Sequence, residues 1–423
     1  MIDETISERR AIEALRAGVP NGDAVRALGS GQSEIIRLFE DKLENAARVQ
    51  ASESTGFVIS GTFGSGKSHL VEELHQRALA GNYVSSKVSI SKETPLHLPQ
   101  KMIQAVVGSM QARDKPEGLL LDMVLGYKSD RPAARDLHAW CGTASSGVSF
   151  MFRSLLDLRD AGIEDLEVID LVARYFSGEV VPVTTIRQRI TELRLRGSIL
   201  DSLTLADLEI EAVPAAQRPW QTMRFLTRFC QVSGYRGWAI FLDEAELISK
   251  YPPLSRARAY EQLGRWLGLR PDHRLSGTAV VSTVVNDFAF EILGAKGDRW
   301  QARELLERGR RYADIVGAPF ADDAIEAIDN ARYLTDMTSE QLRKAHDILR
   351  KAHGRAYSWS APELDSSFRQ HQPMRLYVRR WINEWDLRRL YGLTSLKFDT
   401  EDLEVNLDED NDFDVPDWED GVG

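Results

Sequence analysis

The chain has 423 residues, of which 43% are hydrophobic and 28% charged, as in an ordinary globular protein with a sizeable core. No apolar run approaches the roughly 18 residues of a membrane span, and the charged start lacks the apolar centre of a signal peptide. A membrane-spanning protein is therefore excluded, and a cytoplasmic location is expected. Cys141 and Cys230 lie too far apart in the sequence to suggest a disulfide framework or a metal knuckle.

The net charge of −11 is unevenly distributed along the chain. The segment Asp399–Gly423 contains twelve acidic residues and no lysine or arginine. Without these twelve, the 53 basic residues face 52 acidic ones, so the rest of the chain is nearly neutral. We expect residues 398–423 to form a disordered acidic tail. The charge of the whole chain therefore does not argue against a nucleic-acid partner.

The hydrophobic pattern predicts helices and strands that alternate along the chain. Helices are expected at 7–17, 33–47, 67–80 and 96–110, and through much of 300–391. Short buried strands are expected at 56–60, 83–90, 238–242 and 278–285. Thr338-x-x-Gln341 is a capping box that should open one C-terminal helix. This alternation predicts an α/β fold with a parallel sheet.

The first motif with clear chemistry follows the first strand. Gly61-Thr62-Phe63-Gly64-Ser65-Gly66-Lys67-Ser68 matches GxxxxGK[ST], the pattern of a phosphate-binding P-loop. Glycines let backbone N–H groups surround the phosphates, and the following helix directs its dipole at them. Lys67 would neutralise the β- and γ-phosphates, and the Ser68 hydroxyl would ligate Mg²⁺. The flanking strand and helix disfavour an incidental Gly-rich turn, so ATP and Mg²⁺ are the expected cofactors.

An apolar strand that ends in two acids supplies the second motif, Trp238-Ala239-Ile240-Phe241-Leu242-Asp243-Glu244. Asp243 is expected to hold Mg²⁺, and Glu244 to polarise the attacking water. Thr283 and Asn286 stand near the end of the next strand. In a sheet that places this strand between the two motif strands, they could reach the γ-phosphate or the water. A polar strand end without such a role is the alternative.

Arginines and aromatic residues suggest further functional surfaces. Arginines that could stabilise transferred charge are Arg256, Arg258, Arg303, Arg308, Arg310 and Arg311, and most should be solvated or paired with Glu304 and Glu307. The segment 368–391 interleaves arginines with Tyr377, Trp381, Trp385 and Tyr391, as in some nucleic-acid-binding surfaces. The alternative is an amphipathic helix whose aromatic residues pack inward.

These motifs resemble the AAA+ ATPases of the replication-initiator and helicase-loader type. More narrowly, the segments 9–20, 61–69 and 234–246 resemble the ATP-binding proteins of BREX phage-resistance systems, the BrxD-like group. The resemblance implies a C-terminal helical or winged-helix lid whose Arg375 reaches the nucleotide. It also places His69 in the P-loop segment, and Val19 and Pro20 near the adenine. Met374 separates Pro373 from Arg375, whereas the family more often has proline and arginine adjacent.

The motifs and the resemblance together predict the organisation and function of the chain. We expect lead-in helices in 1–50, a P-loop ATPase core in 51–310 with a helical insertion at about 111–225, a lid in 311–397, and the tail. The predicted function is ATP binding and hydrolysis with DNA and other defence proteins in a prokaryotic anti-phage system. Three alternatives stay open: an assembly switch with little turnover, a DNA-remodelling ATPase of the helicase-loader type, and an acidic tail that docks a basic partner. A homo-oligomer that depends on nucleotide is compatible with each of the first two.

Overall fold

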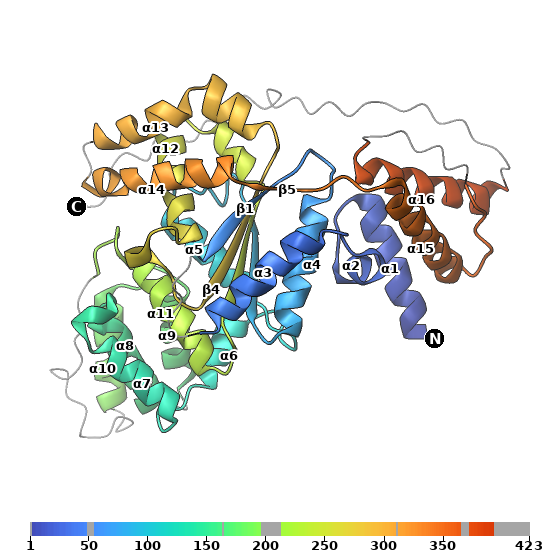
Figure 1. Ribbon diagram of the computed structural model, residues 1–423. Coiled ribbons are helices and arrows are strands. Elements are labelled where there is room, and N and C mark those ends of the chain that lie inside the picture. The colour runs from blue at the N-terminus through green and yellow to red at the C-terminus, as the bar shows by residue number, and fades with distance from the viewer. Residues whose placement is uncertain are drawn as a thin grey trace.

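The computed structural model describes residues 2–48, 55–162, 165–195, 213–309, 312–364 and 372–392. The expected acidic tail, 398–423, lies outside these residues. Within them, helices surround a parallel β-sheet (Figure 1), so the predicted α/β class is confirmed. None of the described helices is long and apolar enough to cross a membrane.

The described strands form one sheet in the order β2-β3-β4-β1-β5, and all neighbouring strands are parallel. Their bounds are β1 Gly56–Ser60, β2 Val84–Ser89, β3 Trp238–Asp243, β4 Thr278–Val284 and β5 Arg332–Tyr333. The first four strands were predicted from their apolar runs, and β4 lies between the two motif strands, the arrangement on which the suggested roles of Thr283 and Asn286 depend. The sequence did not predict β5, because its two residues are exposed and form no apolar run.

Side chains of β3 alternate between two hydrophobic layers, because successive residues of a strand point to opposite faces of the sheet. Ala239 and Phe241 pack with α3 (Ser33–Ala46) and α4 (Lys67–Ala80). Ile240 and Leu242 lie in a larger cluster on the other face. Both faces of the sheet are therefore covered, which explains why β3 is a continuous buried apolar run.

The larger cluster combines the sheet with helices from the middle of the chain. These helices are α5 Pro99–Gly108, α6 Leu119–Leu125, α7 Pro132–Cys141, α8 Phe150–Ala161, α9 Leu166–Phe176, α10 Val183–Leu195, α11 Arg218–Val232, α12 Pro253–Leu267, α13 Asp298–Glu307 and α14 Tyr312–Asp329. Short 3-10 turns lie at Ala144–Ser146, Ala245–Lys250 and Pro271–His273, and a π-helix lies at Ala289–Ala295. Helices α6–α11 begin within the range where we expected an insertion, and α11 extends beyond it.

Aromatic stacking holds the middle of this helical region together. The Phe152 ring lies 4.8 Å from that of Phe225, and the Phe176 ring lies 4.5 Å from Phe225. Cys141 and Cys230 are both free and buried in the same cluster. Burial raises the pKa of the Cys141 thiol to about 12, so this cysteine is an unreactive packing residue.

Helices from the two ends of the chain form a third cluster, which we call the terminal helix group. Its members are α1 Ile2–Ala17, α2 Gly22–Leu28, α15 Ser339–Tyr357 and α16 Met374–Tyr391. Ile12, Leu349, Ile382 and Trp385 meet in its core, and the group lies beside the sheet in Figure 1. The predicted capping box opens α15, where Thr338 and Gln341 satisfy each other's backbone N–H groups. The sequence did not predict α2, which lies between two glycine-containing breaks.

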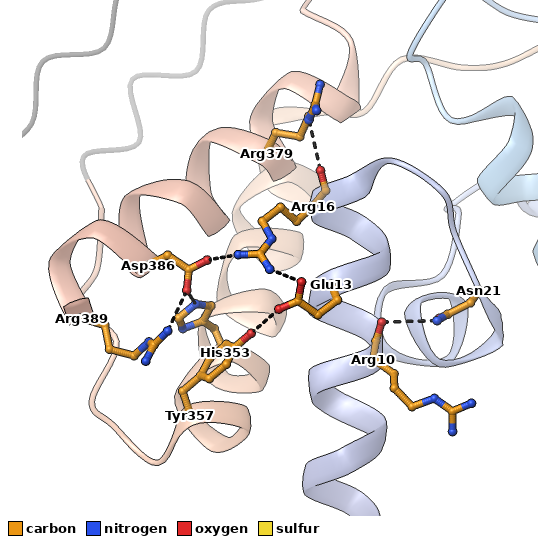
Figure 2. Close-up of polar contacts among 9 residues, drawn as sticks. All are labelled: Arg10, Glu13, Arg16, Asn21, His353, Tyr357, Arg379, Asp386 and Arg389. Carbon is orange, nitrogen blue, oxygen red and sulfur yellow. Dashed lines mark hydrogen bonds and ion pairs between the residues drawn. The ribbon is translucent and has the colours of Figure 1, made fainter. Parts of the chain in front are cut away.

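Polar contacts reinforce the terminal helix group (Figure 2). Arg16 on α1 donates a hydrogen bond of 2.9 Å to Asp386 on α16, and His353 on α15 donates to the same carboxylate at 3.1 Å. Tyr357 donates to Glu13 at 2.8 Å. The two ends of the chain, which we expected to contribute separate lead-in helices and a lid, therefore pack as one unit.

The segment 312–333 does not belong to the terminal helix group. Helix α14 packs against α12 and α13 through its alanine and isoleucine side chains, and β5 pairs with β1. The expected lid range 311–397 thus begins with elements that belong to the layer around the sheet. In the described residues of 339–392 the helices are α15 and α16.

Candidate nucleotide site

The P-loop connects β1 to α4, as the motif requires. Gly64 and Gly66 have φ angles of +73° and +110°, a backbone conformation that favours glycine. Helix α4 begins at Lys67, so its N-terminus faces the loop. The Lys67 ammonium donates hydrogen bonds to the carbonyl oxygens of Gly61, at 2.9 Å, and Thr62, at 3.3 Å. The loop can therefore present N–H groups and a positive charge to an anion.

A cavity of about 200 Å³ opens over this loop. Its walls come from the P-loop, from the acidic strand end and from the terminal helix group. The predicted residues that line it are Pro20, Phe63, Gly64, Ser65, Gly66, Lys67, Ser68, His69, Asp243, Glu244 and Arg375. Gly61 and Thr62 lie at the start of the loop, outside this lining. Val19 is 71% exposed and also lies outside it.

The acidic pair is held at the end of β3 by the neighbouring strand. Thr283 on β4 donates a hydrogen bond to the Asp243 carboxylate. The Glu244 N–H donates to the Thr283 hydroxyl and to Asp243 Oδ1, at 3.1 Å each. Glu244 has a φ of +62°, an uncommon conformation for a residue with a side chain. These contacts fix the strained backbone and position both carboxylates.

Partial burial raises the pKa of Glu244, and the charge of Asp243 adds to this effect, whereas Lys67 opposes it. A carboxylate with a raised pKa is a better proton acceptor, as a general base requires. Asn286 accepts a hydrogen bond of 2.9 Å from the Ser60 hydroxyl. Of the two polar residues at the end of β4, Thr283 therefore contacts the acids, while Asn286 ties β4 to the end of β1.

Glu246 is a cavity-lining acid that the sequence reasoning missed. Its Oε1 lies 4.0 Å from the Lys67 ammonium, and the side chain is only 13% exposed. Burial raises the pKa of Glu246 to about 7, although Lys67 acts in the opposite direction. The signal in the sequence was a third acid two residues after Glu244. In the structure Glu246 belongs to the 3-10 turn Ala245–Lys250, and its side chain lines the cavity.

Arg375 joins the terminal helix group to the P-loop. Its backbone N–H donates to the Gly64 carbonyl at 3.2 Å, and its guanidinium lies 5.7 Å from the centre of the Phe63 ring. A Cβ atom on Gly18 would come within 2.6 Å of the guanidinium. The Nε of Arg375 is buried without a hydrogen-bond partner. An unpartnered buried donor in the cavity wall is consistent with a role in binding an anion.

His69 lines the cavity, and its side chain already forms a hydrogen bond within the protein. Its Nε2 is 2.9 Å from the Gly29 carbonyl oxygen, to which it donates. Burial lowers the pKa of His69, with the Gly29 carbonyl opposing, so the ring is neutral near pH 7. His69 therefore connects α4 to the loop after α2 and adds no positive charge to the phosphate position.

The other arginines in the described residues are largely engaged elsewhere. Arg256 forms two hydrogen bonds with the buried carboxylate of Asp298, at 2.6 and 2.7 Å. Arg303 pairs with Glu307 and Arg308 with Glu304, the two acids that we expected to pair with arginines of this group. Arg310 and Arg311 lie outside the described residues. Arg256 is consequently committed to joining α12 and α13 and is a poor candidate for contact with transferred charge.

The interleaved arginines and aromatics of 368–391 form an amphipathic helix in the described part of that range, α16. Tyr377, Trp381 and Trp385 are buried in the terminal helix group, whereas Tyr391 is 70% exposed. Arg388 pairs with Glu384. The inward packing that we considered as the alternative is therefore what α16 adopts.

Across the described ranges, no group of three or more His, Cys, Asp or Glu side chains could hold a metal ion. Ser68 and Asp243 nevertheless line the same cavity. This donor set suits Mg²⁺ that takes its remaining ligands from phosphate oxygens and water.

Comparison with known proteins finds one family model that matches the N-terminal part of the chain. The model of the family described as BREX system ATP-binding protein BrxC/D matches residues 4–128. The match covers most of α1, all of α2 and the whole P-loop, and it ends before the acidic pair. No curated protein and no solved structure matches the chain. The family match supports ATP binding and a place in a phage-defence system.

Proposed function

We propose that this BrxC/D-like ATP-binding protein hydrolyses ATP at the cavity between its P-loop and its terminal helix group. The observation that carries the proposal is the convergence of Lys67, Asp243 and Glu244 on one cavity. These residues come from segments 176 positions apart in the chain, and they have the chemistry that phosphoryl transfer to water needs.

In this proposal the residues have distinct roles. The Lys67 ammonium leaves the carbonyls of Gly61 and Thr62 to neutralise the β- and γ-phosphates. The Glu244 carboxylate accepts a proton from the attacking water, helped by its raised pKa. Thr283 keeps Asp243 oriented. Arg375 supplies a guanidinium from the terminal helix group to the same cavity.

Magnesium fits the oxygen donors of the cavity. Ser68 and Asp243 would hold it, and when bound it would neutralise the charge that develops on the phosphates. The apolar wall formed by Leu15, Pro20 and Met374 would accept the adenine, and Val19 would lie at its edge. This part of the proposal rests on shape and polarity.

The architecture supports an AAA+ type of ATPase. The P-loop strand β1 and the acidic strand β3 flank β4, and helices α15 and α16 form the lid with α1 and α2. A lid that contributes Arg375 beside the P-loop gives a direct way for nucleotide to alter the contact between the two units. The same arrangement favours a second candidate, a nucleotide-dependent assembly switch with little turnover, in which a homo-oligomer forms with ATP.

Other defence-system proteins are the partners we propose, and DNA is the proposed substrate for remodelling of the helicase-loader type. Because the aromatic residues of α16 are mostly buried, a DNA contact through the lid would rest on exposed cations such as Arg380. Such contacts would be made to phosphates and would carry little sequence preference. A cytoplasmic location follows from this proposed role.

The test is nucleotide binding and hydrolysis by the Lys67→Ala variant. The Lys67 ammonium donates its hydrogen bonds to carbonyls of its own loop, so the variant should fold and lose ATP binding or turnover. The control is Lys351→Ala, which removes an exposed lysine of α15. Hydrolysis by Lys67→Ala at the parent rate would reject the P-loop as the site.

A further inference from the structure

Glu246 lines the cavity with a side chain that is only 13% exposed. Its Oε2 is buried and has no hydrogen-bond partner, whereas Asp243 receives bonds from Thr283 and from the Glu244 N–H. An unsatisfied buried carboxylate oxygen destabilises a fold. Because this position costs stability, we looked for a function of the Glu246 carboxylate in the cavity.

The cation that Glu246 faces is the one proposed to bind phosphates. Lys67 is 8% exposed and reaches three acceptors: the Gly61 and Thr62 carbonyl oxygens, and Glu246 Oε1 at 4.0 Å. All three lie within the protein, so the ammonium is satisfied without nucleotide. A bound β- or γ-phosphate would have to draw the ammonium away from these contacts.

The charge on Glu246 opposes nucleotide in two ways. It attracts the lysine that the phosphates need, and it repels the phosphates themselves. Both effects are strong in a partly buried cavity, because the effective dielectric constant there is far below that of water. The raised pKa of Glu246 reflects the same environment, in which burial and the nearby Asp243 and Glu244 act against its ionisation and Lys67 favours it.

We propose that Glu246 is a positioning residue that holds Lys67 in the nucleotide-free site and thereby weakens nucleotide binding and speeds nucleotide release. This inference rests on the proposed function, because it assigns a competitor to the same phosphate-binding lysine. It goes further by making the affinity of the site for nucleotide a property set by a third acid. In this account the protein discharges ADP readily after each turnover.

The experiment measures dissociation constants for ATP and ADP with the full chain by isothermal titration calorimetry. The variants are Glu246→Gln, which keeps the shape of the side chain, and Glu246→Ala, which removes it. Glu304→Gln is the matched control, since Glu304 is exposed on α13 and pairs with Arg308. Circular dichroism checks that each variant is folded, and adenosine serves as a probe without phosphates.

Both Glu246 variants should bind ATP and ADP about tenfold more tightly than the parent, because one opposing charge has been removed at close range. Adenosine binding and the control should not change. A purely structural role would instead weaken binding of all three ligands. Unchanged or weaker ATP and ADP binding in folded Glu246→Gln, or an equal gain for adenosine, would overturn the role of Glu246.

Failure of the proposed function has a different signature. A parent protein that binds neither nucleotide would refute the nucleotide site and the role of Glu246 together. A parent that binds and hydrolyses ATP, with a Glu246→Gln variant of equal affinity, would refute the role of Glu246 alone.

Discussion

Asp386 is the residue on which the polar contacts of the terminal helix group converge (Figure 2). Its carboxylate is 11% exposed and accepts hydrogen bonds from Arg16 at 2.9 Å, His353 at 3.1 Å and Arg389 at 3.3 Å. The substitution Asp386→Ala removes all three bonds. Arg16 and Arg389 retain 39% and 27% exposure and can recover water, whereas the fully buried His353 cannot.

The expected loss follows from these exposures. Breaking a fully buried ion pair costs about 3–5 kcal/mol, and an exposed pair contributes less than about 1 kcal/mol. Because Asp386 is buried and two of its partners are partly exposed, we expect Asp386→Ala to lower the free energy of unfolding by about 3 kcal/mol. The control Asp322→Ala breaks a pair with Arg303 in which the side chains are 40% and 52% exposed, so its effect should be small.

Urea unfolding followed by tryptophan fluorescence measures the difference, because Trp381 and Trp385 are buried in the same cluster as the pair. Hydrogen exchange would locate the loss, with faster exchange expected in α1 and α16 than in the sheet. Equal free energies of unfolding for Asp386→Ala and Asp322→Ala would refute the reasoning. They would mean that apolar packing alone holds the two ends of the chain together.

Three further predictions concern pH, the cavity wall and the tail. Burial, and then Arg258 and Lys101, lower the pKa of His97 to about 4, so the unfolded state binds more protons and stability falls as pH drops from about 6.5 towards 4. Between pH 7 and pH 5 the parent should lose about 2 kcal/mol more than His97→Gln in urea unfolding, and identical losses would contradict the effect of burial. Gly18→Ala should weaken ATP binding about tenfold, because the added Cβ atom would displace Arg375. The control Gly118→Ala introduces similar backbone strain, at φ +69°, but has open space around it and should not weaken ATP binding. Equal affinities of the two variants in a binding titration would argue against Arg375 as part of the site. Deleting Asp399–Gly423 should raise affinity for duplex DNA at low salt, because twelve acidic residues are removed, and unchanged binding across a salt series would assign the tail another purpose.

The parts of the fold that were predictable from sequence are those with strong local patterns. Strands β1, β3 and β4 are buried apolar runs, and the P-loop is defined by its own residues. Helix α4 begins at Lys67 and ends at Ala80, as its periodicity indicated. These features need little information from distant parts of the chain.

The parts that escaped prediction depend on contacts distant in sequence. Arg16 and Asp386 are 370 positions apart, and the sequence around either residue does not indicate that the two form a pair. The two-residue strand β5 exists because it pairs with Ile59 and Ser60. Glu246 resembled any acid in a turn until the 3-10 helix brought it within 4.0 Å of Lys67. Such features depend on which distant residues come into contact, and local sequence propensity does not determine that.

ATP hydrolysis by Glu244→Gln, measured beside ATP binding, tests the central claim most directly. The substitution keeps the size of the side chain and removes the general base, so ATP and Mg²⁺ should bind nearly as in the parent while hydrolysis falls about 100-fold or more. Asp243→Asn, the companion variant, should instead weaken Mg²⁺-dependent binding, because it removes charge beside the metal position. Hydrolysis by Glu244→Gln at the parent rate would contradict the account, and a parent without hydrolysis even with DNA and partners present would leave the assembly switch in its place.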